Sequence, residues 1–183
     1  MDEYQKMISG IEYNPNDKCL IELREKAWNK SREFNNELNA LARYKILKTL
    51  IGKIGDKCFV MPNFNCDYGC NIEFGDNVYL NMNCVILDSA PVKIGSNTMI
   101  GPNVHIYTPI HPLDYKTRNT LIEYAKPVII GENCWIGGSV VILPGIKIGD
   151  GCVIGAGSVV TKNISENSLA VGNPAKVIKT ILQ

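Results

Sequence analysis

The sequence predicts an all-β solenoid, in which short parallel strands stack coil upon coil, with a helical cap at the N-terminus. Three observations carry this prediction. Aliphatic residues recur every six positions over most of the chain, residues 1–52 show helical spacing instead, and one long segment interrupts the repeats. At 183 residues the chain is long enough for one domain.

The six-residue period is clearest near the C-terminus. From Ile130 the chain reads IGENCW, IGGSVV, ILPGIK, IGDGCV, IGAGSV and VTKNIS, with an aliphatic residue heading each hexad. This spacing does not match the period of an α-helix. It fits strands that turn at Gly or Asn and bury their aliphatic side chains only against neighbouring coils.

The same frame appears earlier with a longer coil. Hexads begin at Ile54, Phe74 and Ile94, which are 20 residues apart. Three hexads make 18 residues, so each early coil is expected to carry a two-residue bulge and the C-terminal coils none. The solenoid is expected to span residues 53–172.

Residues 1–52 are expected to form a two-helix cap over one end of the solenoid, where an open strand edge would otherwise invite aggregation. Pro15-Asn16-Asp17 offers a helix start. The apolar residues at helical spacing are Leu20, Leu23, Ala27, Leu38, Leu41, Ala42, Ile46, Leu47 and Leu50. Residues 173–183 are expected to leave the last coil as a tail or a short helix.

Charge and composition exclude several classes of protein. With 19 Lys and Arg against 18 Asp and Glu, the formal net charge of +1 gives no basic field for nucleic acid. No apolar run approaches the length of a membrane-spanning helix, and the first residues lack the pattern of a signal peptide. We therefore expect a cytoplasmic protein that binds neither nucleic acid nor membranes.

The seven cysteines are expected to be reduced thiols, because their number is odd and no export signal is present. Five of them occupy the fifth place of a hexad and are expected to be small core side chains. These five are Cys58, Cys70, Cys84, Cys134 and Cys152. The spacing of cysteines and histidines does not favour a metal site.

The repeats vanish over residues 107–127, which read YTPIHPLDYKTRNTLIEYAKP. A long interruption of a regular solenoid is more often functional than not. It contains His111, whose neutral imidazole can act as a general base at physiological pH. Glu123, Asp114 and backbone carbonyls of the same loop are the candidates to orient this ring. The other histidine, His105, ends a hexad and is expected to face outward.

Polar residues also interrupt the hexads before this loop. Asp67, Asn81, Asn83 and Asp88 stand where most repeats have Gly or turn residues. Each alone is explained by the preference of Asp and Asn for turns. Their clustering favours a second interpretation, in which some of them line a polyol site.

On these features the sequence resembles the maltose and galactoside O-acetyltransferases, a family of hexapeptide-repeat acyltransferases. The resemblance covers nearly the whole chain and includes the cap pattern from Met7 to Leu20, followed by Ala27 and Phe34-Asn35. The matching solenoid motifs are CDYGCNI (66–72), LNMNCVILD (80–88), HIYTPIHPLD (105–114), KPVIIGENCWIGG (126–138), IGAGSVVTK (154–162) and GNPAKVIK (172–179).

The resemblance implies a left-handed parallel β-helix, a homotrimer with active sites between subunits, and acetyl-CoA as co-substrate with no metal. His111 matches the catalytic histidine. The positions expected to bind the acceptor are Asp17, Asp67, Asn81, Asp88 and Glu123, and those matching CoA contacts are Gly138, Ala156, Thr161, Lys162, Lys176 and Lys179. An alternative interpretation is that the lysines are solvated surface charges with no role in binding. Ser89 stands where galactoside enzymes have an acidic residue, which leaves the choice of acceptor open.

The implied reaction is direct transfer of an acetyl group to a hydroxyl of a sugar of the maltose, glucose or galactoside type, with His111 as general base. One alternative is a hexapeptide-repeat acetyltransferase for a non-sugar acceptor, such as an antibiotic, an amino acid or an amine. Another is a non-catalytic β-helix that serves as a binding module. A β-helix carbonic anhydrase needs three histidine ligands, and the sequence has two histidines.

Overall fold

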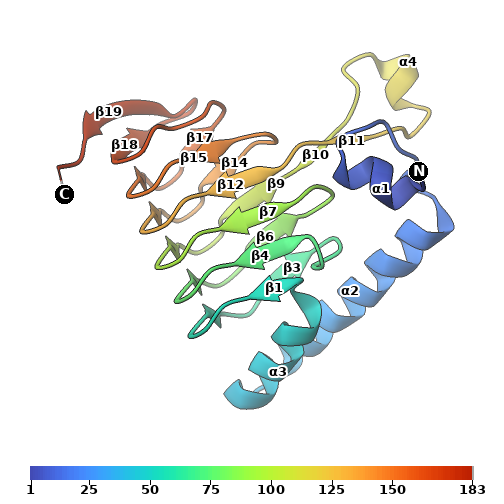
Figure 1. Cartoon of the computed structure of the whole chain (residues 1–183), viewed down its shortest axis with the longest axis horizontal. Coiled ribbons are helices and arrows are strands. Elements are labelled where there is room, and N and C mark those ends of the chain that lie inside the picture. The colour runs from blue at the N-terminus through green and yellow to red at the C-terminus, as the bar shows by residue number, and fades with distance from the viewer. Residues whose placement is uncertain (183) are drawn as a thin grey trace.

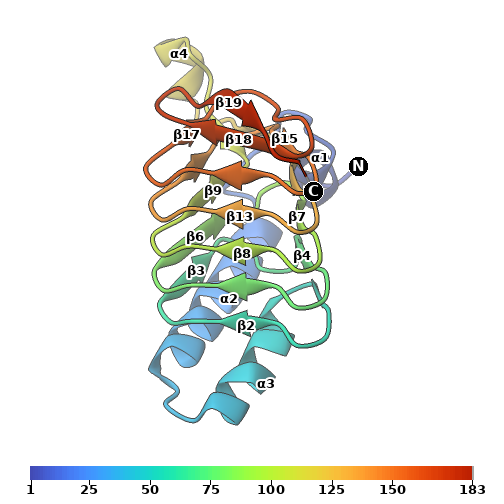
Figure 2. The ribbon, with the colours of Figure 1, turned by 90° about the vertical axis from the view of Figure 1, so that its left-hand side faces the viewer.

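The computed structural model describes residues 1–182 and shows a three-sided parallel β-helix, with the N-terminal helices covering its first coil and running up one side (Figures 1 and 2). The predicted solenoid with an N-terminal helical cap is therefore confirmed. Its core is continuous from the cap helices through the successive coils, because residues such as Phe34, Phe64 and Ile136 belong to one buried cluster.

Three sheets form the sides of the β-helix. Sheet 1 contains β1 (Lys53–Ile54), β4 (Ile72–Phe74), β7 (Val92–Ile94), β12 (Val128–Ile130) and β15 (Lys147–Ile148). Sheet 2 contains β2 (Phe59–Val60), β5 (Tyr79–Leu80), β8 (Met99–Ile100), β13 (Trp135–Ile136), β16 (Val153–Ile154), β18 (Ser168–Val171) and β19 (Lys176–Thr180). Sheet 3 contains β3 (Phe64–Cys66), β6 (Cys84–Leu87), β9 (His105–Tyr107), β14 (Val141–Ile142) and β17 (Val159–Val160).

The strand register confirms the two coil lengths. Lys53 pairs with Glu73 and Glu73 with Lys93, a step of 20 residues, whereas Ile129 pairs with Lys147, a step of 18. Because both steps are even numbers of residues, parallel pairing at these steps keeps the first, aliphatic residue of each hexad on the inner face of the sheet.

The extra residues of the early coils all fall at one corner of the β-helix. Buried Val60 and Cys66 are six positions apart, but Cys66 and buried Phe74 are eight apart. The additional residues thus lie between sheets 3 and 1, where the long insertion also leaves the solenoid. We call this edge the loop corner; it consists of residues 67–71, 88–91 and 108–127. The edge between sheets 2 and 3, here called the plain corner, consists of residues 61–63, 81–83, 101–104, 137–140 and 155–158.

The tight turns explain the Asn found in many hexads. Asn77, Asn97 and Asn133 have φ values of 56°, 58° and 57°, in the left-handed region. Asn tolerates this conformation better than most residues that carry a Cβ, so its recurrence marks where each coil bends.

Most of the cysteines behave as predicted. All seven are free thiols. Cys58, Cys84, Cys134 and Cys152 are buried, and their thiols donate to backbone carbonyls, as from Cys134 Sγ to Gly149 O at 3.1 Å. The expectation is wrong for Cys70, which is exposed because it lies in the longer turn of the loop corner and not on an inner face.

The cap contains three helices, one more than predicted: α1 (Glu3–Ile8), α2 (Lys18–Asn36) and α3 (Ala40–Leu50). Helix α2 begins at the predicted place, with Asp17 as N-cap accepting from Cys19 N at 3.0 Å. Helix α1 has six residues and buries only Met7, too short a segment for a periodic signal. Within residues 1–182 no helix is both long and apolar enough to cross a bilayer.

The C-terminal segment differs from the expected tail or short helix. Strand β19 pairs antiparallel with β18, from Ser168 opposite Thr180 to Val171 opposite Lys176. The chain reverses at Gly172, whose φ of 102° is a conformation that favours glycine. The return strand covers the outer edge of sheet 2 (Figure 2).

The insertion folds as a hairpin with a helical tip. Strand β10 (Pro109–Ile110) pairs antiparallel with β11 (Tyr124–Ala125), and α4 (Tyr115–Arg118) lies between them. Asp114 caps α4 by accepting from Thr117 N at 2.8 Å. The hairpin projects from the solenoid beside α1 (Figure 1).

Candidate active site

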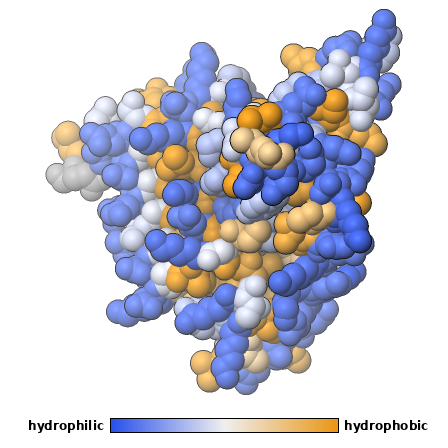
Figure 3. All heavy atoms as spheres, turned by 45° about the vertical axis from the view of Figure 1, so that its right-hand side comes forward, coloured by the Kyte–Doolittle hydropathy of each residue, from blue (hydrophilic) through white to orange (hydrophobic). Residues whose placement is uncertain are grey.

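A cleft of about 690 Å³ opens at the loop corner, between the cap and the inserted hairpin. Its volume is within the range of about 300–1,000 Å³ that is typical of small-molecule sites. The lining residues are Pro15, Asn16, Arg24, Trp28, Asp67, Tyr68, Leu87, Ser89, Pro109, His111, Arg118, Asn119, Leu121 and Glu123. The surface near the cap and the hairpin mixes hydrophilic and hydrophobic groups (Figure 3). The cleft therefore draws on α2 and the segment before it, on two coils of the solenoid and on the insertion.

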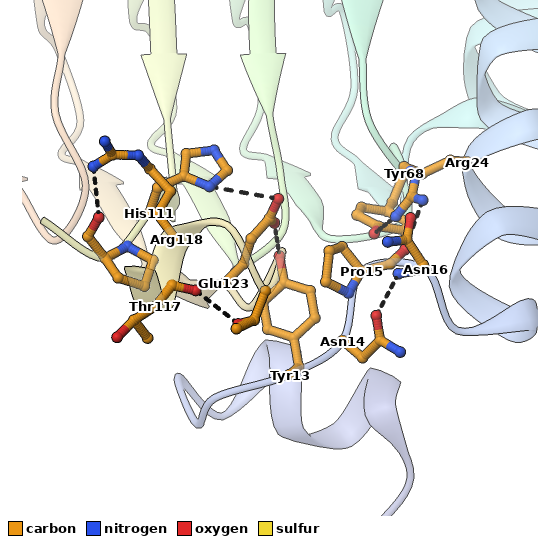
Figure 4. Close-up of polar contacts among 12 residues, drawn as sticks. Tyr13, Asn14, Pro15, Asn16, Arg24, Tyr68, His111, Thr117, Arg118 and Glu123 are labelled. Atoms are coloured by element: carbon orange, nitrogen blue, oxygen red, sulfur yellow. Dashed lines mark hydrogen bonds and ion pairs between the residues drawn. The ribbon is translucent and has the colours of Figure 1, made fainter. Parts of the chain in front are cut away.

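His111 and Glu123 face each other across the base of the hairpin (Figure 4). His111 Nδ1 lies 3.9 Å from Glu123 Oε1, and the His111 side chain is 59% exposed. Of the predicted orienting partners, Asp114 is occupied as the cap of α4, so Glu123 is the carboxylate that lies beside the ring. A carboxylate at Nδ1 favours the tautomer in which Nε2 is free to accept a proton.

Glu123 is in turn held by the cap. The Tyr13 hydroxyl donates to Glu123 Oε2 at 2.6 Å. The two backbones also pair, with Tyr13 N donating to Glu123 O at 3.0 Å and Glu123 N donating to Tyr13 O at 3.2 Å. Burial, reinforced by the hydrogen bond to Glu123, raises the pKa of Tyr13 above its ordinary value, so the phenol remains a donor.

Asp67 contributes a second carboxyl to the cleft. Burial raises its pKa to about 7, the negative charges of Asp88 and Glu123 add to this effect, and Arg24 opposes it. Near neutral pH the Asp67 carboxyl is therefore present in both forms and can donate or accept a hydrogen bond.

Asp88 supports the cleft from behind. Its side chain is fully buried, with Oδ1 accepting from Asp67 N at 3.1 Å and Tyr68 N at 2.8 Å and Oδ2 accepting from Asn71 N at 3.2 Å. These bonds fix the turn that presents Asp67. Asp88 has no surface open to the cleft, so the expected direct contact with an acceptor does not fit its position.

Arg24 joins the cap to the solenoid at the cleft wall. Its Nη1 donates to the Tyr68 hydroxyl and its Nη2 to Pro15 O, both at 2.7 Å (Figure 4). Arg118 similarly donates from Nη1 to the carbonyls of Pro112 and Leu113, at 3.0 and 3.1 Å, and so holds the insertion on itself.

Other predicted site residues lie outside the cleft. Asp17 caps α2, next to the lining residue Asn16. Asn81 lies at the plain corner, where its Oδ1 accepts from Met82 N at 2.8 Å. His105 points outward from β9, as expected, with Nδ1 2.7 Å from the Tyr107 hydroxyl.

The six positions matched to CoA contacts are spread over the upper coils. Gly138 and Ala156 lie at the plain corner, Thr161 and Lys162 follow β17, and Lys176 and Lys179 lie on β19. All except the half-buried Gly138 are exposed. None of the six lines the cleft of His111 within one chain.

Sequence reasoning missed several residues of the cleft, chiefly Arg24, Trp28, Tyr68, Arg118 and Leu121. Arg24 and Trp28 are four residues apart and so share one face of α2, but nothing in the sequence shows which part of the solenoid that face meets. Leu121 has a φ of 65° and is 58% exposed, a backbone strain that only the structure reveals.

Comparison with known proteins connects this arrangement to an enzyme family. Residues 6–55 match the maltose acetyltransferase hexapeptide capping motif, and residues 127–162 match the hexapeptide repeat of succinyl-transferase. A maltose O-acetyltransferase structure from Clostridium difficile 630 is 50% identical, with a TM-score of 0.99 over 100% of this chain and 99% of that chain. A hexapeptide-repeat acetyltransferase from Vibrio cholerae, solved with acetyl coenzyme A, is 37% identical, with a TM-score of 0.95 over 100% of both chains.

Galactoside O-acetyltransferase from Lactococcus lactis is 36% identical over 184 residues, covering 99% of this chain and 89% of that protein. The capped β-helix and the cleft under its inserted loop thus define a hexapeptide-repeat acyltransferase. Within that class, the chain belongs to the maltose and galactoside O-acetyltransferase family and is an acetyltransferase. Among residues 1–182 no group of three or more His, Cys, Asp or Glu side chains is placed to hold a metal ion.

Proposed function

We propose that this acetyltransferase transfers the acetyl group of acetyl-CoA directly to a hydroxyl of a sugar, with His111 as the general base. The observation that carries the proposal is that His111 lies beside Glu123 in a cleft lined by polar, aromatic and aliphatic side chains. The family assignment makes the chain an acetyltransferase, so the alternative to this proposal is an acceptor other than a sugar.

In the proposed reaction, His111 Nε2 takes the proton of the acceptor hydroxyl as its oxygen attacks the thioester carbonyl carbon. The tetrahedral intermediate collapses with cleavage of the carbon–sulfur bond, and the imidazolium returns the proton to the departing CoA thiolate. Glu123 holds the ring through Nδ1 and stabilises its positive charge during the reaction. The acetyl group passes between the two substrates without a covalent intermediate on the protein.

The composition of the cleft supports a sugar as the acceptor. The Asp67 carboxyl, the Ser89 hydroxyl and the Arg24 guanidinium offer hydrogen bonds, while the indole of Trp28, 48% exposed, offers an apolar face. A sugar ring carries hydroxyl groups around its rim and C–H groups on its faces, which suits polar groups beside an aromatic surface.

The distribution of the remaining family positions supports a homotrimer. His111 and Asp67 lie at the loop corner, whereas Asn81, Gly138 and Ala156 lie at the plain corner. A cyclic assembly brings the plain corner of one copy to the loop corner of the next, which gathers both sets around one site. The lysines at 162, 176 and 179 then provide positive charge for the phosphates of CoA.

Sheet 2 offers an apolar surface for this assembly. Its outward side chains Phe59, Met99 and Trp135 are 45%, 54% and 55% exposed, and Phe59 stacks on Tyr79 with ring centroids 5.9 Å apart. The outer face of sheet 1 is charged by comparison, with Lys93 and Glu73 forming an ion pair at 3.3 Å. Contiguous exposed apolar groups of this kind mark association surfaces.

The test measures release of free CoA from acetyl-CoA by chromatography, with maltose, glucose, galactosides, serine and an antibiotic panel as acceptors. We expect sugar-dependent release, and a fall in kcat of about 10²- to 10⁴-fold in the His111→Ala variant with CoA binding retained. His105→Ala is the matched control, because His105 lies outside the cleft. Equal activity in His111→Ala and the wild type would sink the assignment of the base.

A further inference from the structure

We infer that Tyr13, a residue of the cap, is a positioning residue that sets the orientation of His111 by holding Glu123. The inference rests on the proposed role of His111 and extends it, because it makes the N-terminal cap part of the catalytic apparatus. Tyr13 does not line the cleft itself, but its hydroxyl binds Glu123, which does, and this contact is the route by which we expect it to act.

The two carboxylate oxygens of Glu123 have different neighbours. Oε2 accepts the hydrogen bond from the Tyr13 hydroxyl at 2.6 Å, and Oε1 lies 3.9 Å from His111 Nδ1 (Figure 4). A carboxylate held at one oxygen cannot turn freely, so the bond to Tyr13 determines that Oε1 faces the imidazole. The distance of 3.9 Å is longer than a hydrogen bond, and contacts of this kind often tighten when substrates bind.

The surrounding packing holds the Tyr13 side chain in place, so that Tyr13 can anchor Glu123 and, through it, His111. Tyr13 is 2% exposed and belongs to a buried cluster with Met7 of α1, Leu20 of α2, Tyr68 and Ala125. The cluster thus joins α1 and α2 of the cap to the solenoid and to the insertion. A side chain clamped on several sides is suited to hold a catalytic group, whose position must be kept within a fraction of an ångström.

A purely structural role is the competing explanation, since Tyr13 also ties the insertion to the cap. The chain contains an internal comparison for it. The Tyr124 hydroxyl donates to Glu12 Oε2 at 2.8 Å, so the same two segments carry a second tyrosine–glutamate bond in the opposite sense. Neither Tyr124 nor Glu12 lines the cleft. Tyr124→Phe therefore removes a more exposed tyrosine–glutamate link between the same two segments without touching His111 or its partner.

The kinetic experiment compares Tyr13→Phe with Tyr124→Phe in the full chain. We expect Tyr13→Phe to lower kcat by about ten- to a hundredfold, the loss typical of a slightly misplaced catalytic group. The KM values for acetyl-CoA and the acceptor should stay within about twofold, since no binding group is removed. Tyr124→Phe should keep the wild-type kcat. Equal kcat values in the two variants overturn the inference.

A double-mutant cycle shows whether Tyr13 acts through Glu123. In a Glu123→Gln background, addition of Tyr13→Phe should cost less than about twofold in kcat, because the group that it positions is already gone. A further tenfold loss in that background assigns Tyr13 a separate role and overturns the inference. Melting temperatures of all variants check that each is folded at the assay temperature.

Nuclear magnetic resonance of the imidazole nitrogens separates this inference from the proposed function. With only His105 and His111 in the sequence, the ring signals are assigned by comparison with His111→Ala. We expect the proton on Nδ1 of His111 in the wild type and in Tyr124→Phe, and a larger share on Nε2 in Tyr13→Phe. If no acceptor supports acetyl transfer, the proposed function fails while this result still decides the role of Tyr13. An unchanged tautomer in Tyr13→Phe, or a wild type without the proton on Nδ1, overturns the inference.

Discussion

Asp67 is a carboxyl that the fold keeps partly protonated. Burial raises its pKa to about 7, with Asp88 and Glu123 adding to the effect. The folded chain therefore holds a proton over a range in which the unfolded chain, with an ordinary pKa of about 3.9, has released it. The bound proton therefore stabilises the folded chain fully below the unfolded-state pKa of about 3.9, and this stabilisation is lost as the pH rises through the folded-state pKa of about 7.

Asp67→Asn should therefore raise the melting temperature at pH 8, by a few degrees, and the gain should vanish by about pH 4. Each 1 kcal/mol is worth about 2–4 °C in a domain of this size. Scanning fluorimetry across this pH range measures the difference. Asp56→Asn, which removes an exposed carboxyl at another corner, is the control and should shift little. An equal gain at pH 4 and pH 8 would contradict the assigned cause.

The site residues that the sequence can reveal are those whose context is local. His111 stands out because the repeat breaks around it, and Glu123 is a candidate because it lies in the same insertion. Arg24 and Trp28, which line the cleft, and Tyr13, which binds Glu123, are different, since they meet the site only when the cap folds back on the loop corner. No periodicity in residues 1–52 encodes that contact, so these residues require the structure.

At the junction between the cap and the solenoid, the side chain of one helix residue forms hydrogen bonds with the free backbone groups of an edge strand. β3 is the edge strand of sheet 3. The Asn35 side chain of α2 accepts from Phe64 N at 2.8 Å and donates to Phe64 O at 2.9 Å, in place of a neighbouring strand. Phe34 packs edge-on against the Phe64 ring, with centroids 6.4 Å apart. The edge is thereby closed to pairing with other chains.

Asn35→Ala should lower stability by about 1–3 kcal/mol, because it leaves a backbone donor and acceptor of β3 without partners. The neighbouring Asn36→Ala is matched in residue type and helix position, but Asn36 is exposed and bonds only to Arg32 O within α2. It should change stability by less than about 0.5 kcal/mol. Denaturant titration of both variants measures the difference, and similar losses in the two would refute the role of Asn35.

Among the elements, the strands of the hexads could be predicted because each six-residue unit repeats the same buried position. The two-residue bulges were also predictable in number, from the 20-residue steps, but their corner was not. Helix α1 and β19 escaped prediction for physical reasons: α1 buries a single residue, and β19 returns antiparallel to the solenoid that the repeat describes. Its five residues are exposed, so no buried face marks the strand in the sequence.

At the scale of the whole molecule, residues matched to site positions of the family lie at two different edges of the β-helix. The loop corner carries the cleft with His111, and the plain corner carries Asn81, Gly138 and Ala156, of which the last two lie on successive coils. Sheet 2, one of the two sheets that meet at the plain corner, exposes Met99 and Trp135 on its outer face. This geometry favours a cyclic assembly in which each site takes one edge from each of two copies.

Such an assembly predicts complementation between two defective chains. When His111→Ala and Asn81→Ala chains are co-expressed in equal amounts and mix at random, about one site in four receives an intact edge from each copy. The mixed oligomer should recover about a quarter of the wild-type activity, although each variant alone is strongly impaired. His111→Ala mixed with Asp67→Ala is the control, because both changes lie on the same edge and no pairing of copies restores it. Recovery no greater than the sum of the separate variants would place the complete site within a single chain.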